Sequence, residues 1–112
     1  MITRLLVLAS LTAVSFTAGA DFRTVQRAYE VVLSDFRAPA TPNGAASFQP
    51  CESCDRMTVR VTPQTRYQVN DDVVELAEFR QQLRTISDRD AETVIVLHHL
   101  EADILTAISV TL

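Results

Sequence analysis

Met57-Thr-Val-Arg-Val-Thr62 and Arg66-Tyr-Gln-Val69 decide the fold class, because apolar and polar residues alternate along both segments. Successive side chains of a β-strand point to opposite faces, so the alternation predicts two half-buried strands. Thr62-Pro63-Gln64 lies between them and predicts a turn. Asn70-Asp71-Asp72 tolerates the left-handed conformation of a tight turn, and Val73-Val74 follows as a short returning strand. The centre of the chain is therefore expected to be a β-meander.

After Glu75 the apolar residues change to a helical spacing. They are Leu76, Phe79, Leu83 and Ile86. This spacing predicts a helix over residues 75–86. Thr93–Leu97 is apolar and rich in β-branched residues, which is typical of a strand buried on both faces. Alternation over residues 104–112 predicts a last strand, with Glu101-Ala102-Asp103 as its connection. A helix over residues 101–108 fits the same apolar residues and is the alternative.

On the N-terminal side, residues 21–37 also carry apolar side chains at helical spacing. These are Phe22, Val25, Tyr29, Val32, Leu33 and Phe36. The opposite face is charged or polar, so the segment is predicted to be an amphipathic helix. It ends before Pro39, because the residue that precedes a proline is pushed out of the helical region. Residues 38–50 contain three prolines and no periodic apolar pattern, which predicts a flexible linker.

Together these segments predict an α+β fold, in which the N-terminal amphipathic helix is tethered to a ββαββ meander over residues 51–112. The second helix and the two strand pairs each present one apolar stripe, so a common core is expected. Its predicted members are Tyr67, Val69, Phe79, Leu83, Val94, Val96, Ile108 and Val110.

The first twenty residues predict a signal peptide. Arg4 is their only charged residue, Leu5–Phe16 is an apolar run, and Ala18-Gly19-Ala20 is the small-x-small pattern of a cleavage site. The run is shorter than the roughly 20 residues of a membrane-spanning helix. We expect the mature chain to begin at Asp21, in the periplasm or outside the cell. An uncleaved anchor and a buried core helix are the alternatives.

Charge and composition exclude several classes of protein. Without the leader, nine arginines stand against fourteen acidic residues, a net charge of −5, which argues against a nucleic-acid partner. Two glycines and two cysteines are too few for a glycine-rich phosphate loop, a four-cysteine metal site or a dense disulfide framework. No serine lies in a nucleophile motif, so we expect no enzymatic activity and no cofactor.

Cys51 and Cys54 are separated by two residues, and in an oxidising compartment such thiols are expected to form a disulfide. Reduced cysteines and intermolecular disulfides are the alternatives. A redox pair would require the first thiol at a helix N-terminus, but strand alternation follows Cys54. A metal site would draw on Cys51, Cys54, His98 and His99. Because successive strand residues face opposite ways, only one of the two histidines could join the thiols.

The order of Met57–Asn70, Val74–Phe79, Val94–Val96 and Leu105–Val110 resembles that of uncharacterised exported domains built on a small OB-like β-barrel. In those domains a strand ends in Thr-x-Tyr/Phe-x-Val-Asn, a Leu-rich turn follows, and a strand with Ala, Ile and Val closes the domain. The resemblance covers residues 57–112 and implies an OB-like partial β-barrel. It also implies a secreted binding or accessory module and supplies no catalytic residues.

A second resemblance is to periplasmic domains of the TolR and ExbD type. In these domains a short strand pair leads into a Leu-rich helix and a Val-Ile-Val strand. They continue with a further helix and strand, for which Leu100–Leu112 is short. They also follow a membrane helix with a functional acidic residue, and Ile2–Phe16 contains none.

We therefore expect a non-catalytic exported binding or accessory module, whose partner is an unknown protein or envelope component. The apolar face of the predicted N-terminal helix is the candidate surface for a partner and for self-association. This face consists of Phe22, Val25, Tyr29, Val32 and Phe36. A membrane is not an expected partner once the leader is removed. The alternative is a small periplasmic redox or metal-binding protein that uses Cys51 and Cys54.

Overall fold

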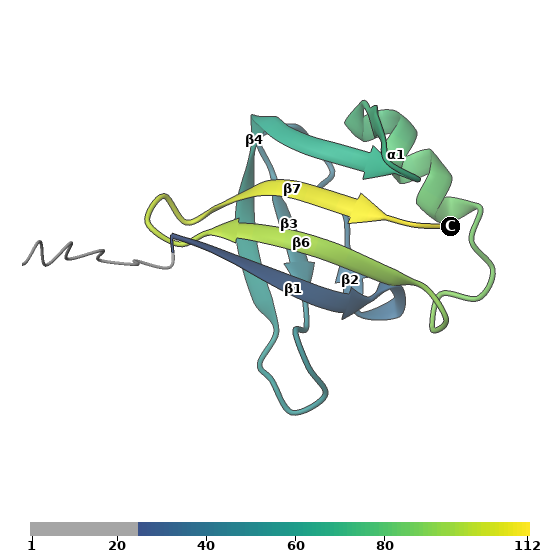
Figure 1. Cartoon of the computed structure of the whole chain (residues 1–112), viewed down its shortest axis with the longest axis horizontal. Helices are drawn as coiled ribbons and strands as arrows, with labels where there is room; N and C mark the ends of the chain where they lie inside the picture. The colour runs from purple at the N-terminus through teal and green to yellow at the C-terminus, as the bar shows by residue number, and fades with distance from the viewer. Residues whose placement is uncertain (1–24) are drawn as a thin grey trace, which may run out of the picture.

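The alternating residues 57–69 form the longest strand, β4, and the other strands are arranged around it. The structure is a computed structural model that describes residues 25–112. One mixed sheet with the strand order β1-β6-β7-β4-β3-β2 curls into a half-barrel, and β5 pairs with β4 (Figure 1). The elements are β1 (Gln26–Val32), the 3-10 turn η1 (Leu33–Asp35), β2 (Phe36–Arg37), β3 (Ala45–Phe48), β4 (Met57–Val69), β5 (Asp72–Val74), α1 (Leu76–Arg84), β6 (Thr93–His99) and β7 (Ile104–Val110).

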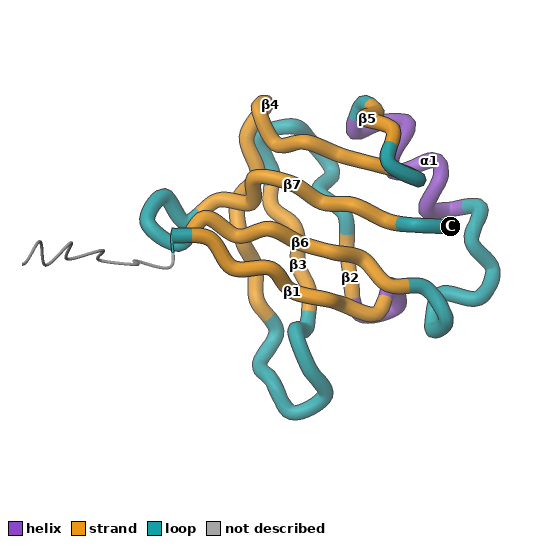
Figure 2. The backbone as a smooth tube through the Cα atoms, viewed as in Figure 1, coloured by secondary structure: helices purple, strands orange, loops and turns teal. Residues whose placement is uncertain are grey.

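The predicted fold class is wrong. Strands hold 49% of the described residues and helices 14%, so the protein is mostly β rather than α+β with an N-terminal helix. Figure 2 shows α1 beside the end of β4, while strands and loops make up nearly all of the rest. None of the helices in residues 25–112 has the length and apolarity needed to cross a bilayer.

The predicted helix over residues 21–37 is replaced by β1, η1 and β2; residues 21–24 lie outside the described part of the chain. Val31 is buried, whereas Val25 and Val32, which the helical spacing placed on its apolar face, are 42% and 40% exposed. β1 pairs with β6 along its whole length, from Gln26↔His99 to Val32↔Thr93. This pairing satisfies the backbone hydrogen bonds of β1. The spacing of apolar residues along the chain does not show a partner strand that is more than sixty residues away.

The predicted linker over residues 38–50 is also wrong in part, because it contains β3. Ala46 and Phe48 are both 0% exposed, and β3 lies between β2 and β4 in the sheet. This strand has only two buried positions and prolines on both sides, so the alternation is too brief to be recognised in the sequence.

No turn interrupts β4 at Thr62-Pro63-Gln64, contrary to the prediction. Instead, the register between β4 and β7 shifts between Val61 and Arg66, and residues 62–65 have no paired residue on either neighbouring strand. Pro63 lies in this unpaired stretch, so its missing N–H removes no ladder hydrogen bond.

Thr65 stabilises the irregular part of β4 from inside the half-barrel. Its buried hydroxyl accepts a hydrogen bond from the Thr62 N–H at 2.9 Å and donates one to the Leu105 carbonyl at 2.7 Å. The side chain thus replaces backbone pairing across the register shift and connects β4 to β7.

The C-terminal half follows the predicted order of elements. α1 lies within the helix expected over residues 75–86, and β6 and β7 form an antiparallel hairpin, which overturns the helical alternative for residues 101–108. The turn residues Asn70, Asp71 and Asp103 have φ angles of 51°, 69° and 52°, as tight turns of this kind require. β7 then runs parallel to β4, with α1 in the connection between β4 and β6.

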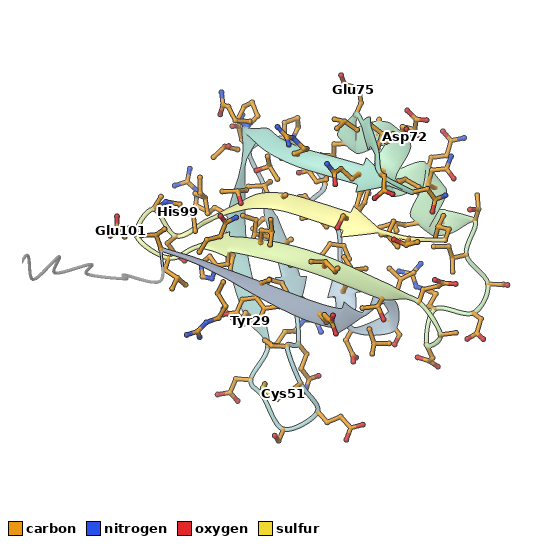
Figure 3. All side chains as sticks on the ribbon, in the orientation of Figure 1. Tyr29, Cys51, Asp72, Glu75, His99 and Glu101 are labelled. Carbon is orange, nitrogen blue, oxygen red and sulfur yellow. A yellow bond between two sulfur atoms is a disulfide. The ribbon has the colours of Figure 1, made fainter. Side chains whose placement is uncertain are left out.

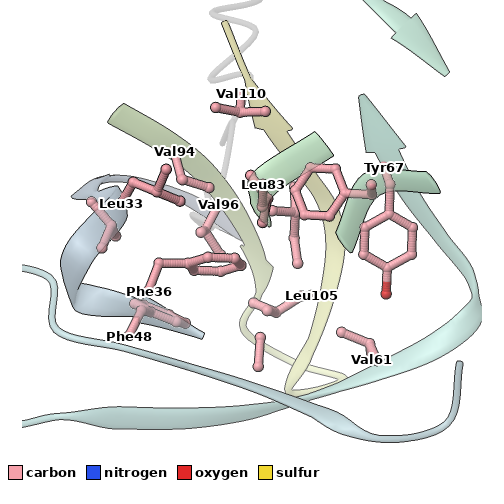
Figure 4. Packing of buried hydrophobic residues seen from close by; sticks show 14 of the residues in the cluster. Leu33, Phe36, Phe48, Val61, Tyr67, Leu83, Val94, Val96, Leu105 and Val110 are labelled. Carbon is pink, nitrogen blue, oxygen red and sulfur yellow. The ribbon is translucent and has the colours of Figure 1, made fainter. Parts of the chain in front are cut away.

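The predicted core is confirmed, since each of its eight residues is buried. Figure 4 labels five of them inside the curled sheet, together with Leu33, Phe36 and Phe48 from the N-terminal segments; the five are Tyr67, Leu83, Val94, Val96 and Val110. The additional members are Val31, Leu33, Phe36, Ala46 and Phe48. Phe79 has no exposed surface and joins α1 to β4, because the centroid of its ring lies 5.3 Å from that of the Tyr67 ring. Burial raises the pKa of Tyr67 to about 12, because the phenolate would lose its hydration.

Candidate functional site

The predicted disulfide joins Cys51 and Cys54 in the loop between β3 and β4. Figure 3 shows Cys51 at the tip of this hairpin, away from the half-barrel. Gln49 holds the loop, because its side-chain nitrogen donates to the carbonyls of Glu52 at 3.0 Å and Cys54 at 3.1 Å. The cysteines lie at the bends on either side of the Glu52-Ser53 turn and not at a helix N-terminus, so the disulfide closes a short loop without the support of a helix dipole.

The histidines lie elsewhere, at the turn between β6 and β7. His98 is 6% exposed, and its Nε2 lies 2.8 Å from a carboxylate oxygen of Asp103. His99 faces the other way, and its Nδ1 accepts the Ala102 N–H at 3.1 Å. Both histidines therefore hold this turn.

The structure does not bring the four candidate metal ligands together. His99 and Cys51 lie at separate ends of the molecule in Figure 3. Within residues 25–112, no three His, Cys, Asp or Glu side chains group in a way that could hold a metal ion.

The candidate partner face of the N-terminal segment is also divided. Phe22 lies outside the described residues, Val25 and Val32 are exposed, and Phe36 is in the core. Tyr29 is half-buried, with its ring 5.6 Å from that of Phe48. These side chains therefore do not form one surface, and self-association through the segment stays a prediction.

A different site is visible only in the folded chain: a pocket of about 200 Å³ between β2, α1 and the loop that follows α1. Its lining consists of Phe36, Arg37, Ala38, Arg80, Leu83, Arg84 and Arg89. We call it the arginine pocket. None of the carboxylates in the described part of the chain lines it.

Strand alternation and helical spacing explain why three of these arginines point into the pocket. On β2, alternation puts Phe36 inside the half-barrel and Arg37 outside it. On α1, Arg80 and Arg84 are four residues apart and thus on one side of the helix, while Leu83 points into the core. The buried side chains fix the two elements, and the arginines extend from the seam between them.

Hydrogen bonds hold two of the four guanidinium groups. Arg80 donates from Nη1 to the Ala40 carbonyl at 3.2 Å, and Arg89 donates from Nη1 to the Leu83 carbonyl at 3.0 Å. A guanidinium has five N–H groups, so both retain free donors. Arg37 and Arg84 make no side-chain hydrogen bond to the described residues.

The clustering opposes the charge of the chain as a whole. Four of the eight arginines in residues 25–112 line this pocket, although the same residues contain thirteen carboxylates. None of the four forms an ion pair with a described carboxylate. Like charges four residues apart on a helix cost about 0.2–0.5 kcal/mol, so Arg80 and Arg84 are mildly destabilising as they stand. An anion in the pocket would remove this repulsion.

Helix stabilisation explains only part of the cluster. Arg84 lies in the last turn of α1 and Arg89 binds a carbonyl there, which suits the negative end of the helix dipole. Arg37 belongs to β2 and Arg80 to the middle of α1, so the dipole accounts for neither.

Larger hollows exist on the described surface, but their chemistry is mixed. One of them, of about 380 Å³, lies along β1, β6 and β7 and includes Glu30, Glu92 and Ile95 in its lining. We therefore identify the candidate site by its charge and not by its volume.

One feature of the sequence pointed to this site, although the spacing of apolar residues did not reveal it. Arg80 and Arg84 form a like-charge pair at helical spacing, which a purely structural helix would avoid. Arg37 and Arg89 carry no such sign, because only the packing of β2 and the loop against α1 brings them to the same pocket.

Comparison with known proteins adds no relative to this picture: the chain matches no protein-family model, no curated protein and no solved structure.

Proposed function

We propose that the protein is an exported, non-catalytic binding or accessory module that holds the acidic part of its ligand in the arginine pocket. The observation that carries the proposal is the concentration of four arginines, without a carboxylate from the described residues, in a chain with an acidic net charge. Guanidinium groups are the side chains best suited to bind carboxylate, sulfate and phosphate oxygens through paired hydrogen bonds.

We also propose that the half-barrel is OB-like, and the strand arrangement supports this part of the proposal. β4 and β7 are parallel, α1 connects β4 to β6, and the two ends of the sheet are the consecutive strands β1 and β2. OB-like barrels bind extended ligands on their strand faces and loops, often oligosaccharides or oligonucleotides. With a net charge of −5 for the mature chain, an acidic envelope component is favoured over a nucleic acid.

Binding to immobilised dextran sulfate, with neutral dextran as the matched surface, tests the proposal on the purified exported protein. We expect the wild-type protein to bind only the sulfated surface. Arg37→Gln combined with Arg84→Gln should abolish this binding. Arg60→Gln combined with Arg66→Gln is the charge-matched control, because both arginines are exposed on β4 and lie outside the arginine pocket. Equal loss in the control, or no binding by the wild type, would contradict the proposal.

Export is tested separately by the mass of the protein in the exported fraction. The leader ends in Ala18-Gly19-Ala20, so the mature chain should begin at Asp21. Ala20→Arg should block maturation, because the peptidase requires a small residue there. Exported protein that still carries residues 1–20 would contradict the prediction.

A further inference from the structure

We infer that the arginine pocket recognises a phosphate monoester group, the part of a larger envelope ligand that enters the pocket. The inference rests on the proposed function and names the chemistry of the acidic group. It follows from the charge of the pocket, the number of free donors and the volume.

The charge of the arginine pocket favours a phosphate monoester. Four positively charged guanidinium groups line the pocket, and none is paired with a described carboxylate. A carboxylate or a sulfate ester brings one negative charge, whereas a phosphate monoester brings about −1.5 to −2 near pH 7. The monoester therefore relieves more of the mutual repulsion among the arginines.

The guanidinium N–H donors lie on two sides of the pocket, which also favours a phosphate monoester. Arg37 and Arg84 approach from β2 and α1 with no side-chain hydrogen bond to residues 25–112, and Arg80 is held beside them by its bond to Ala40. A carboxylate offers two oxygens, which one guanidinium fork can saturate. A phosphate monoester offers three terminal oxygens directed to different sides, so it can use donors from both walls.

The volume of the pocket suits a small group and not a whole ligand. About 200 Å³ is less than the roughly 300–1,000 Å³ of pockets that enclose a whole drug-sized ligand. The floor is apolar, because Phe36 and Leu83 belong to the core and Ala38 packs against it. The pocket therefore suits a compact charged group, with the remainder of the ligand outside on the surface.

Two ligands that share a sugar skeleton test this chemistry: glucose 6-phosphate and glucuronate, titrated into the full exported protein at equal ionic strength by calorimetry. We expect the phosphate to bind at least about tenfold more tightly, since charge-assisted bonds to a dianion are stronger. Arg37→Gln and Arg84→Gln should each weaken phosphate binding by about tenfold, and Arg66→Gln should leave it within about twofold.

Arg84→Lys separates recognition from simple attraction. Lysine keeps the charge but lacks the planar fork, so phosphate binding should fall to a value between those of the wild type and Arg84→Gln. Thermal unfolding of each variant shows that the fold is retained.

Vesicles distinguish a soluble phosphate from a lipid headgroup. Phosphatidic acid carries a phosphate monoester and phosphatidylglycerol a diester, and the fraction of phosphatidylglycerol is raised until the two kinds of vesicle have equal surface charge. Binding to both the sugar phosphate and phosphatidic acid vesicles, but not to phosphatidylglycerol, supports a monoester on a lipid. Binding to the sugar phosphate alone supports a soluble or polymer-borne monoester.

Two results would overturn the inference. If glucuronate binds as tightly as glucose 6-phosphate while dextran sulfate binding still depends on Arg37 and Arg84, the phosphate assignment fails and the proposed function stands. If glucose 6-phosphate, glucuronate and dextran sulfate all fail to bind, the phosphate assignment and the proposed function both fail.

Discussion

The interior of the half-barrel and the arginine pocket meet at Phe36 and Leu83, yet the two regions are built from opposite chemistry. The interior is filled by apolar side chains whose burial stabilises the fold. The pocket on the other side of the same two elements holds four like charges, which oppose each other until an anion arrives. The difference teaches that packing positions the arginines while binding uses them, so stability and recognition should respond to different substitutions.

The largest effect should come from the interior. Phe79→Ala removes a ring with no exposed surface from the junction of α1 and β4, at a cost of about 3–5 kcal/mol. This is comparable to the whole stability of so small a domain, so the variant should be largely unfolded in a urea titration followed by circular dichroism. Val73→Ala, at a side chain 65% exposed, should change stability by less than about 0.5 kcal/mol. A wild-type melting temperature for Phe79→Ala would mean that the fold is organised elsewhere.

A smaller effect is expected at the polar link inside the half-barrel. Thr65→Val leaves the Leu105 carbonyl and the Thr62 N–H without their partner, which should cost about 1–3 kcal/mol. Chemical denaturation measures the loss, and Thr58→Val at an exposed position of the same strand is the control. If both variants lose equally little, the hydroxyl does not support the register shift of β4.

The disulfide should matter less than either buried group. Cys51→Ser with Cys54→Ser opens a short exposed loop, so the cost should be about 2 kcal/mol or less and thermal unfolding should stay cooperative. Loss of cooperativity would show that the hairpin, rather than the apolar interior, holds the molecule together.

The smallest effect on stability is expected at the arginine pocket. Arg37→Gln with Arg84→Gln should shift stability by less than about 0.5 kcal/mol at low salt, because the relief of like-charge repulsion offsets the lost attraction between Arg84 and the C-terminal end of α1. The difference from the wild type should shrink as salt screens both interactions. Melting temperatures at low and high ionic strength measure it. A large destabilisation would assign these arginines to the fold and weaken the separation between the two regions.

Prediction from the sequence succeeded where the partner of a residue is close along the chain. The period of α1, the β6–β7 hairpin and the turns at Asn70 and Asp103 depend on neighbouring residues, and the structure contains them. It failed for β1 and β2, because Tyr29, Val32 and Phe36 fit a helix locally and only pairing with β6 and β3 makes these segments strands. It also failed at Pro63, which reads as a turn but lies inside β4.

The amino-acid sequence is enough to predict the apolar core of the C-terminal half, its order of elements, the paired cysteines and the acidic net charge of the chain. These features depend on composition and on periods of two to four residues. Only the tertiary structure decided that the N-terminal segments enter the sheet, that β4 lies beside β7, and that Arg37 and Arg89 join Arg80 and Arg84 around one pocket. The physical reason is that strand pairing and charge clustering join residues tens of positions apart, and no local pattern encodes which distant segment will be the neighbour.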